Sequence, residues 1–460
     1  MRYLKKMQFK SITTVLSVFI GLSFFGQNLN TSPYTRFGLG EIIKPITTHY
    51  LGMGGLSVSF SDYQQVNISN PATYSTLKKN NPVFDLGIFG KMSNYKAESN
   101  GEINTSQGNN FLLNNMILGL PVTKRCGLTF GLLPYSTVGY DISSNTLISN
   151  DTVTYNYRGD GSINRILLGT GYDLINKGDT TRFSLGLNSS YIFGTLNRNS
   201  SVIFQESAFY NSRVQNRMIL SGFSFDAGIH FYQEVKGKAE NDRWIYQLGA
   251  TQTFSSEINA RRDFYAYSFI YNFSVQEIPK DTTYFYEDQS GSITIPDHFS
   301  IGMNIGRNKQ DKNVWSLGAQ FNIYNWDIYK EVFENIESDF QELSQMTELI
   351  IGGRITPSLD FDNKNKNAFG KSTYSFGLRY CNSFININNE QLTNYGMNFG
   401  ISIPLLSSRS ISRINISTEL GRIGTIENEL IEESYLKLSV GFSLAPDTRY
   451  DRWFKKRKYD

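Results

Sequence analysis

The feature that most constrains this fold is a two-residue alternation of apolar residues with small or polar ones, repeated in segments of about ten residues. Because successive side chains of a strand point to opposite faces, this period predicts strands that have one apolar face. The alternation is also seen in 183–193 and 374–381. In the segment from Trp315 the apolar positions are Trp315, Leu317, Ala319, Phe321 and Ile323, and the positions between them are Ser316, Gly318, Gln320 and Asn322.

A soluble sandwich alternates in the same way, so composition has to decide where these strands lie. Aromatic residues make up 14% of the chain, with 33 Phe and 28 Tyr, whereas charged residues reach only 18%. Tyr and Trp gather at segment ends, where a membrane barrel carries aromatic girdles, and glycines occupy inward positions. A mean hydropathy of −0.33 fits such a protein, because half of each strand faces a polar lumen. We therefore predict an all-β, transmembrane antiparallel barrel.

About fourteen segments of this kind occur, an even number, as bacterial barrels have. Short polar connections alternate with long ones. This alternation predicts that the short ones are periplasmic turns and the long ones extracellular loops. Residues 264–273 are predicted to form an extracellular extension of a hairpin. The connection 358–372 is longer than its periplasmic place favours. The long connections are 139–161, 196–216, 256–297 and 325–347. The segments begin near Phe84, Leu112, Leu128, Ile166, Phe183, Phe223, Trp244, Phe299, Trp315, Leu349, Tyr374, Tyr395, Ile414 and Leu436.

The N-terminus reads as an export signal. Basic residues from Arg2 to Lys10 precede an apolar run, Ser11–Phe25, that is too short to span a bilayer comfortably. We expect a signal peptide at 1–26, a glycine-rich hatch segment in the lumen at 27–82, the barrel at 83–445 and a basic periplasmic tail at 446–460. The predicted location is the outer membrane of a Gram-negative bacterium, with the barrel integral to it.

One segment of the last long connection breaks the strand pattern. Ile328, Val332, Ile336, Phe340 and Leu343 recur at helical spacing, with acidic residues between them. This spacing predicts a short amphipathic helix, which either lies over the extracellular mouth or packs on its own loop.

The sequence offers little for catalysis. The three histidines, His49, His230 and His298, lie in neither a nucleophile elbow nor a metal-ligand spacing. The two cysteines, Cys126 and Cys381, are predicted to be free thiols or at most one bridge. We expect no enzyme, no cofactor, no metal site and no nucleic-acid partner.

Charged residues at inward positions are candidate lumen residues: Arg354, Arg379, Glu419 and Lys437. They either select solutes or pair with the hatch, since a charge shielded from water needs a partner. Asp62 and Asp85 are the candidate partners.

Several motifs resemble those of the FadL family of outer-membrane transporters. The glycine-rich run within His49–Phe60 leads to Asn-Pro-Ala within Asn67–Tyr74, and Gly127–Pro134 and Ile295–Gly302 are similar to later strands of the family. Trp326 also falls where that family has a Trp after a strand. A Bacteroidetes-type subgroup is similar at Thr31–Gly40, Tyr395–Pro404 and Asp451–Asp460.

The resemblance implies a channel for hydrophobic small molecules such as long-chain fatty acids, with outer-membrane lipids around it. Pro134 is then a candidate strand distortion at a lateral gate, although it also suits a simple strand end. The alternative function is a non-transporting barrel subunit of an outer-membrane protein assembly or type IX secretion machinery. The candidate ligand and hatch residues are Gly52, Gly54, Gly55, Asn70, Pro71 and Ala72.

Overall fold

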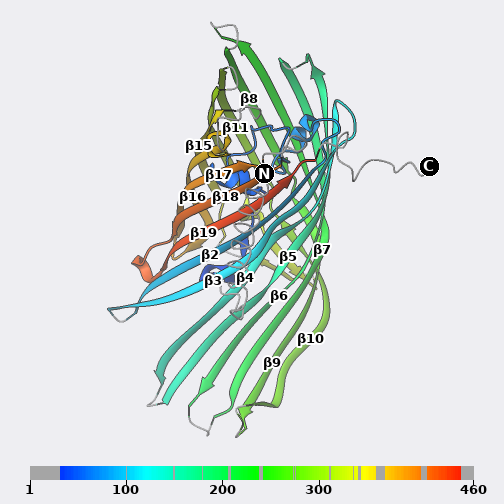
Figure 1. Ribbon diagram of the computed structural model, residues 1–460. Helices are drawn as coiled ribbons and strands as arrows, with labels where there is room; N and C mark the ends of the chain where they lie inside the picture. Colours follow the sequence, from blue (N-terminus) through cyan, green and yellow to red (C-terminus); the bar gives the residue numbers. More distant parts are fainter. Residues whose placement is uncertain are drawn as a thin grey trace, which may run out of the picture.

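The wall of this protein is one antiparallel sheet that closes on itself (Figure 1). The computed structural model describes residues 32–446 apart from 100, 149–150, 179, 206–208, 238–241, 273, 275, 310–311, 335, 340–342, 359–367 and 406–411. The sheet closes because the last strand, β19 (Ile431–Leu444), pairs with β2 (Val83–Ser99). The result is a barrel of 14 strands, as the sequence predicts.

The wall strands follow one another around the barrel in chain order. At one end β8 continues into β9 (Ser256–Tyr271), and β10 (Glu277–Ile295) leads into β11, so that β9 and β10 form a hairpin beyond the wall. Between β2 and β19 the wall strands are β3 (Glu102–Pro121), β4 (Cys126–Ile148), β5 (Asp151–Asn176), β6 (Thr181–Phe204), β7 (Asn211–Lys236), β8 (Asp242–Thr253), β11 (His298–Lys309), β12 (Lys312–Tyr324), β15 (Met346–Ser358), β16 (Thr373–Ile387), β17 (Glu390–Pro404) and β18 (Arg413–Ile423).

The alternation of the sequence becomes the two faces of the wall. In β12, Leu317 is 58% exposed on the outer face, whereas Gln320 is 5% exposed and points into the barrel. The same division separates Leu187 from Ser184 in β6. An apolar outer face and a polar inner one are what a barrel in a bilayer requires. None of the described helices is long and apolar enough to cross a membrane.

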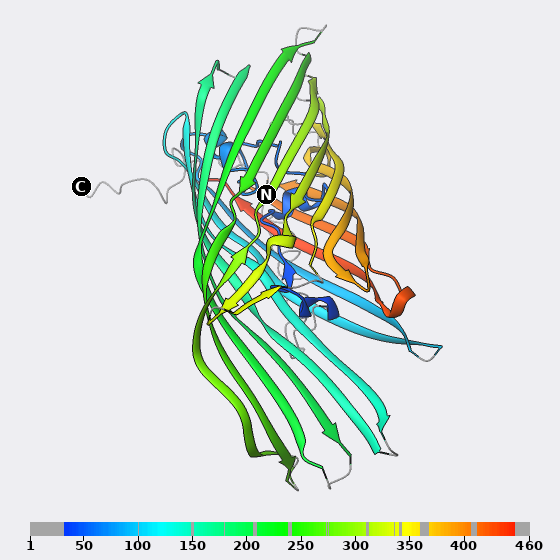
Figure 2. The same cartoon turned by 180° about the vertical axis from the view of Figure 1, so that it is seen from behind.

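The two ends of the barrel differ. One end has short turns, such as 122–125 between β3 and β4, whereas β4–β7, β9 and β10 run far past the other end (Figures 1 and 2). We call the latter the long-strand end. The sequence places long connections correctly at 139–161 and 196–216, but they are paired strands nearly to their tips, since Ile148 pairs with Asp151. The predicted extension at 264–273 lies in the β9–β10 hairpin.

The predicted helix over 328–343 is wrong. After η3 (Trp326–Ile328) the chain forms β13 (Lys330–Phe333) and β14 (Ile336–Asp339), joined at Glu334, whose φ is +50°. β13 pairs with β10, and its inward residues Glu331 and Phe333 are buried. Tertiary pairing to an existing sheet edge overrides the helical spacing of this short segment.

The described residues that precede the barrel, 32–82, lie inside it, and we call them the plug. Tyr50, Met53 and Leu56 of the plug are fully buried. The plug is mostly irregular, as its glycines predict. Its elements are η1 (Pro33–Arg36), β1 (Glu41–Ile42), α2 (Thr48–Leu51) and η2 (Pro71–Thr76), and the remaining short helices of the chain are η4 (Ala368–Lys371) and η5 (Glu427–Glu429). The predicted signal peptide and nearly all of the predicted basic tail lie outside the described residues.

Candidate functional site

The glycine-rich run of the plug makes backbone contact with the wall. Gly54 and Gly55 have φ of +75° and +91°, a conformation that glycine adopts without the steric cost of a side chain. A Cβ atom at Gly52 would lie 2.8 Å from the Cα of Gly400 in β17, and one at Gly377 in β16 would overlap the backbone of Met53. Glycines on both sides thus let the two backbones approach.

The Asn-Pro-Ala motif fixes the other side of the plug. Asn70 caps η2, because its Oδ1 accepts a hydrogen bond from the Ala72 N–H at 3.1 Å, and Pro71 occupies the first helical position. The Asn70 Nδ2 donates to the Val58 carbonyl at 2.8 Å and to the Ile229 carbonyl of β7 at 3.0 Å. The six predicted hatch residues therefore lie at plug–wall contacts.

Arg354 of β15 pairs with the plug, as the sequence allows. Its Nη1 donates to the His49 Nε2 at 2.9 Å and to the Asp62 Oδ2 at 3.4 Å. Burial, and then the Arg354 charge, lowers the pKa of His49 to about 3. Burial raises the pKa of Asp62, but the Arg354 charge and a hydrogen bond from the Gln64 N–H act against it, so that the net pKa is lowered. We call this group the Arg354 node: a neutral His49 beside the Arg354–Asp62 ion pair.

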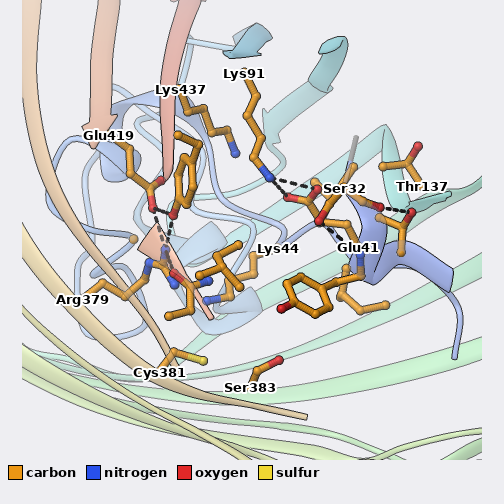
Figure 3. Close-up of a pocket in the computed structure, with 18 of the residues that line it drawn as sticks. Ser32, Glu41, Lys44, Lys91, Thr137, Arg379, Cys381, Ser383, Glu419 and Lys437 are labelled. Carbon is orange, nitrogen blue, oxygen red and sulfur yellow. Dashed lines mark hydrogen bonds and ion pairs between the residues drawn. The ribbon is translucent and has the colours of Figure 1, made fainter. Parts of the chain in front are cut away.

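A second charged group joins the plug to β15, β16 and β18 (Figure 3). Arg379 lies 2.6 Å from the Glu419 carboxylate and 3.6 Å from that of Glu348, which also pairs with Lys44 of the plug. Tyr435 donates to Glu419 at 2.8 Å. Arg379 and Glu419, both predicted lumen charges, therefore pair mainly with each other, and Arg379 reaches the plug through Glu348.

The third group lies beside the start of β19. Lys91 of β2 contacts Glu433 at 2.9 Å and Glu41 of the plug at 3.3 Å. Lys437, the last predicted lumen charge, places its Nζ 4.0 Å from the centre of the Phe89 ring, a cation–π contact. Sequence reasoning missed Lys91, Glu348 and Glu433, although each occupies an inward position of an alternating segment.

Of the two predicted acidic partners only Asp62 contacts a predicted lumen charge. Asp85 instead accepts hydrogen bonds from Asn115 and Ser443, which are neutral. These residues lie on the two strands beside β2 and provide the hydrogen bonds of the carboxylate. Asp85 is therefore satisfied without a cation from the plug.

A cavity of about 200 Å³ remains between the plug, β2–β4 and β16–β19. Its apolar lining includes Ile42, Leu112 and Phe384, and its charged lining includes the Lys91, Arg379 and Lys437 groups described above (Figure 3). Sites for drug-sized ligands occupy roughly 300–1,000 Å³. The cavity is therefore small and charged on one side.

The wall is split beside this cavity. β3 and β4 pair only between Met116–Pro121 and Gly127–Leu132. Two residues further on, β4 has a bulge between Pro134 and Ser136, and β3 and β4 then diverge (Figures 1 and 2). Proline provides no ladder N–H, so it suits a bulge at such a point.

The contacts of the other two histidines and the state of the two cysteines indicate structural roles for these residues. His230 contacts the Ser59 carbonyl at 3.0 Å, and His298 stacks on Tyr324 with ring centroids 4.2 Å apart. Cys126 and Cys381 are free thiols. Among the described residues no group of three or more His, Cys, Asp or Glu could hold a metal ion.

A closed antiparallel barrel of 14 strands, apolar on its outer face and polar on its inner face, defines a fold class, that of the FadL-like barrels. The toluene transporter TodX of Pseudomonas putida has a similar fold, with a TM-score of 0.55, 15% identity, and coverage of 88% of this chain and 99% of that one. A FadL homologue of Pseudomonas aeruginosa is similar with a TM-score of 0.51, 10% identity and coverage of 88% and 99%. Neither is described as an enzyme, in agreement with the sequence prediction.

The family model BamG matches residues 7–460, so the chain belongs to the BamG family. No curated protein matches it.

Proposed function

We propose that this protein is a non-transporting barrel subunit of an outer-membrane protein assembly or secretion machinery in a Gram-negative bacterium. The observation that carries this proposal is the filled and charged lumen. The cavity beside the Lys91, Arg379 and Lys437 groups offers a hydrophobic ligand only about 200 Å³. Lys91 and Arg379 have ionic partners there, and an apolar ligand that displaced those partners would leave buried charges unpaired, which is unfavourable.

The plug is also held from several sides, which suits a structural role. Beyond the Arg354 node, the Gln320 Oε1 of β12 accepts from the backbone N–H groups of Ser57 and Val58, both at 3.0 Å. The Arg413 Nε of β18 donates to the Gln64 Oε1 at 2.9 Å. Moving the plug would break these buried hydrogen bonds and leave polar groups without partners. Each such contact therefore raises the free energy of plug opening.

A second candidate is a channel for hydrophobic small molecules, such as long-chain fatty acids. The split between β3 and β4 favours it, because the split lies next to the cavity and a ligand leaving sideways would meet it. In this candidate Pro134 marks the lateral gate, and the plug acts as a hatch that moves to open the path.

A disulfide bridge between the plug and the wall distinguishes the two candidate functions. A Cβ atom at Gly302 of β11 would lie 3.5 Å from the Cβ of Ser59 in the plug, within the range of a disulfide. We therefore expect the double variant Ser59→Cys/Gly302→Cys to form a bridge under oxidising conditions and to release it on reduction. Each single cysteine variant is the matched control for packing.

Assembly of outer-membrane proteins in producing cells and uptake of a labelled fatty acid by proteoliposomes are the two readouts. A subunit role predicts that the oxidised double variant supports assembly as well as the reduced one. Fatty-acid uptake that is present in the reduced form and lost on oxidation would contradict the proposal and support the channel.

A further inference from the structure

Among the described residues, one edge of β4 at the long-strand end has no strand beside it. β4 pairs with β5 along its whole length to Ile148, but on its other side β3 leaves after Leu132. Within the described part of the chain, no backbone hydrogen bond reaches this side of Asp141–Ile148. We call Asp141–Ile148 the β4 edge. Its side chains from Ser143 onwards are exposed, with Leu147 at 76%.

The same side of β4 already binds a strand of its own chain. β1 pairs with it in antiparallel register, Glu41 opposite Thr137 and Ile42 opposite Ser136. The Ile43 N–H donates to the Tyr135 carbonyl at 2.9 Å, and the Ser32 N–H to the Gly139 carbonyl at 3.1 Å. These bonds show that the backbone of β4 accepts an added strand on this side, and the β4 edge continues the line outwards.

The composition of the β4 edge differs from that of the outer edge of β10, another long edge without a partner strand among the described residues. Exposed edges are normally protected by proline, lysine, other charges or bulges that prevent added strands from pairing. The outer side of β10 over 277–290 has these devices: Pro279, Lys280, Asp281, Glu287 and Asp288, with register shifts nearby. The β4 edge has one charge, Asp141, no proline or lysine, and an unbroken register with β5.

We propose that the β4 edge is a docking site for an extended β-strand of a partner protein. Backbone hydrogen bonds would supply the affinity and alternate side chains the register, as in other cases of strand addition. Exposed Leu147 and Ile148 favour a partner strand with apolar residues towards the tip of the β4–β5 hairpin. This inference rests on the proposed subunit role, because a machinery of several chains would supply a partner strand.

Site-specific photo-crosslinking in producing cells tests the inference. A photoreactive amino acid is placed at Ser144 or at Thr146, which point to the same face, and at Thr283 on the protected β10 edge as the matched control. We expect adducts with one polypeptide from the β4 positions, at least tenfold more than from Thr283. In mass spectra, the crosslinked partner residue should move by two when the probe moves by two, as strand pairing requires.

Lysine substitutions give an independent test. Ser144→Lys/Thr146→Lys should reduce the partner recovered with the purified barrel at least tenfold, whereas Thr283→Lys should leave recovery unchanged. Equal crosslinking from both edges, an adduct position that does not follow the probe, or an intact complex in the double lysine variant would overturn the inference. If partners co-purify in fixed stoichiometry without β4 crosslinks, the subunit role stands and only the docking site fails. A monomer without partners contradicts both.

Discussion

Acidification should loosen the plug through His49. This imidazole is 6% exposed and accepts a hydrogen bond from Arg354, so protonation would remove the acceptor and place a second cation 2.9 Å from the guanidinium nitrogen. Its pKa is about 3 in the folded protein, against 6.5 for the free side chain. The open plug therefore binds more protons than the closed one between these values, and the stability of the closed plug falls as pH falls below about 6.5.

The magnitude follows from that shift. At pH 5 the released His49 would be almost fully protonated and the buried one almost fully neutral, so lowering pH from 7 to 5 costs about 2 kcal/mol of plug stability. The lowered pKa of Asp62 acts in the same direction but only below its ordinary value near 3.8, so it adds little at pH 5. The Arg354 and Arg413 charges facing His49 stay unchanged over this range.

Hydrogen–deuterium exchange of the plug over 48–64 measures the effect, after correction for the intrinsic pH dependence of exchange. We expect opening free energies to fall by about 2 kcal/mol between pH 7 and pH 5. In His49→Gln the amide oxygen can still accept from Arg354, so the fall should be about 2 kcal/mol smaller than in the wild type. His230 and His298 are present in both proteins and cancel in the comparison. An equal fall in the variant, or none in the wild type, would refute the reasoning.

Three further changes test other contacts of the plug and the charged groups. Arg354→Gln leaves the buried Asp62 carboxylate without its cation, and should lower the free energy of plug opening by roughly 3 kcal/mol in the same exchange experiment; protection unchanged in this variant would argue against the node. Gly377→Ala places a methyl group against the Met53 backbone, so its thermal midpoint should fall by several degrees, whereas the control Gly90→Ala meets nothing closer than 3.8 Å and should match the wild type. Glu419→Gln removes the strongest partner of Arg379 and should lower the midpoint of thermal unfolding, an expectation that an unchanged midpoint would contradict.

The wall could be predicted from the sequence because its signal is local. The alternation around Trp315 and Phe183 fixes which residues face outwards, and that division depends only on the two-residue period of a strand. Membrane exposure makes the pattern strict, since every second residue faces lipid. The number of strands follows from counting such segments.

The contacts of the lumen could be predicted only in part, because they depend on which strands end up opposite the plug. Arg354 finds the expected Asp62, but Asp85 is satisfied by wall neighbours that no sequence spacing indicates. Glu348, which joins Lys44 to Arg379, was missed because a single inward carboxylate carries no motif.

The two errors at the long-strand end have one cause. Segments such as 139–161 appear as loops because they are polar on both faces, and 328–343 appears helical because its apolar residues are spaced by about four. In the structure a neighbouring strand supplies hydrogen bonds in each case, β5 for β4 and β10 for β13. Strand formation there depends on tertiary pairing, which local pattern does not encode.

The most direct test of the proposed function is native mass spectrometry of the protein extracted in mild detergent from its own outer membrane, with bound lipids identified in the same sample. The subunit role predicts a complex with partner chains in fixed stoichiometry and no retained fatty acid. A monomer that carries fatty acids or other apolar molecules would contradict it and identify the barrel as a channel.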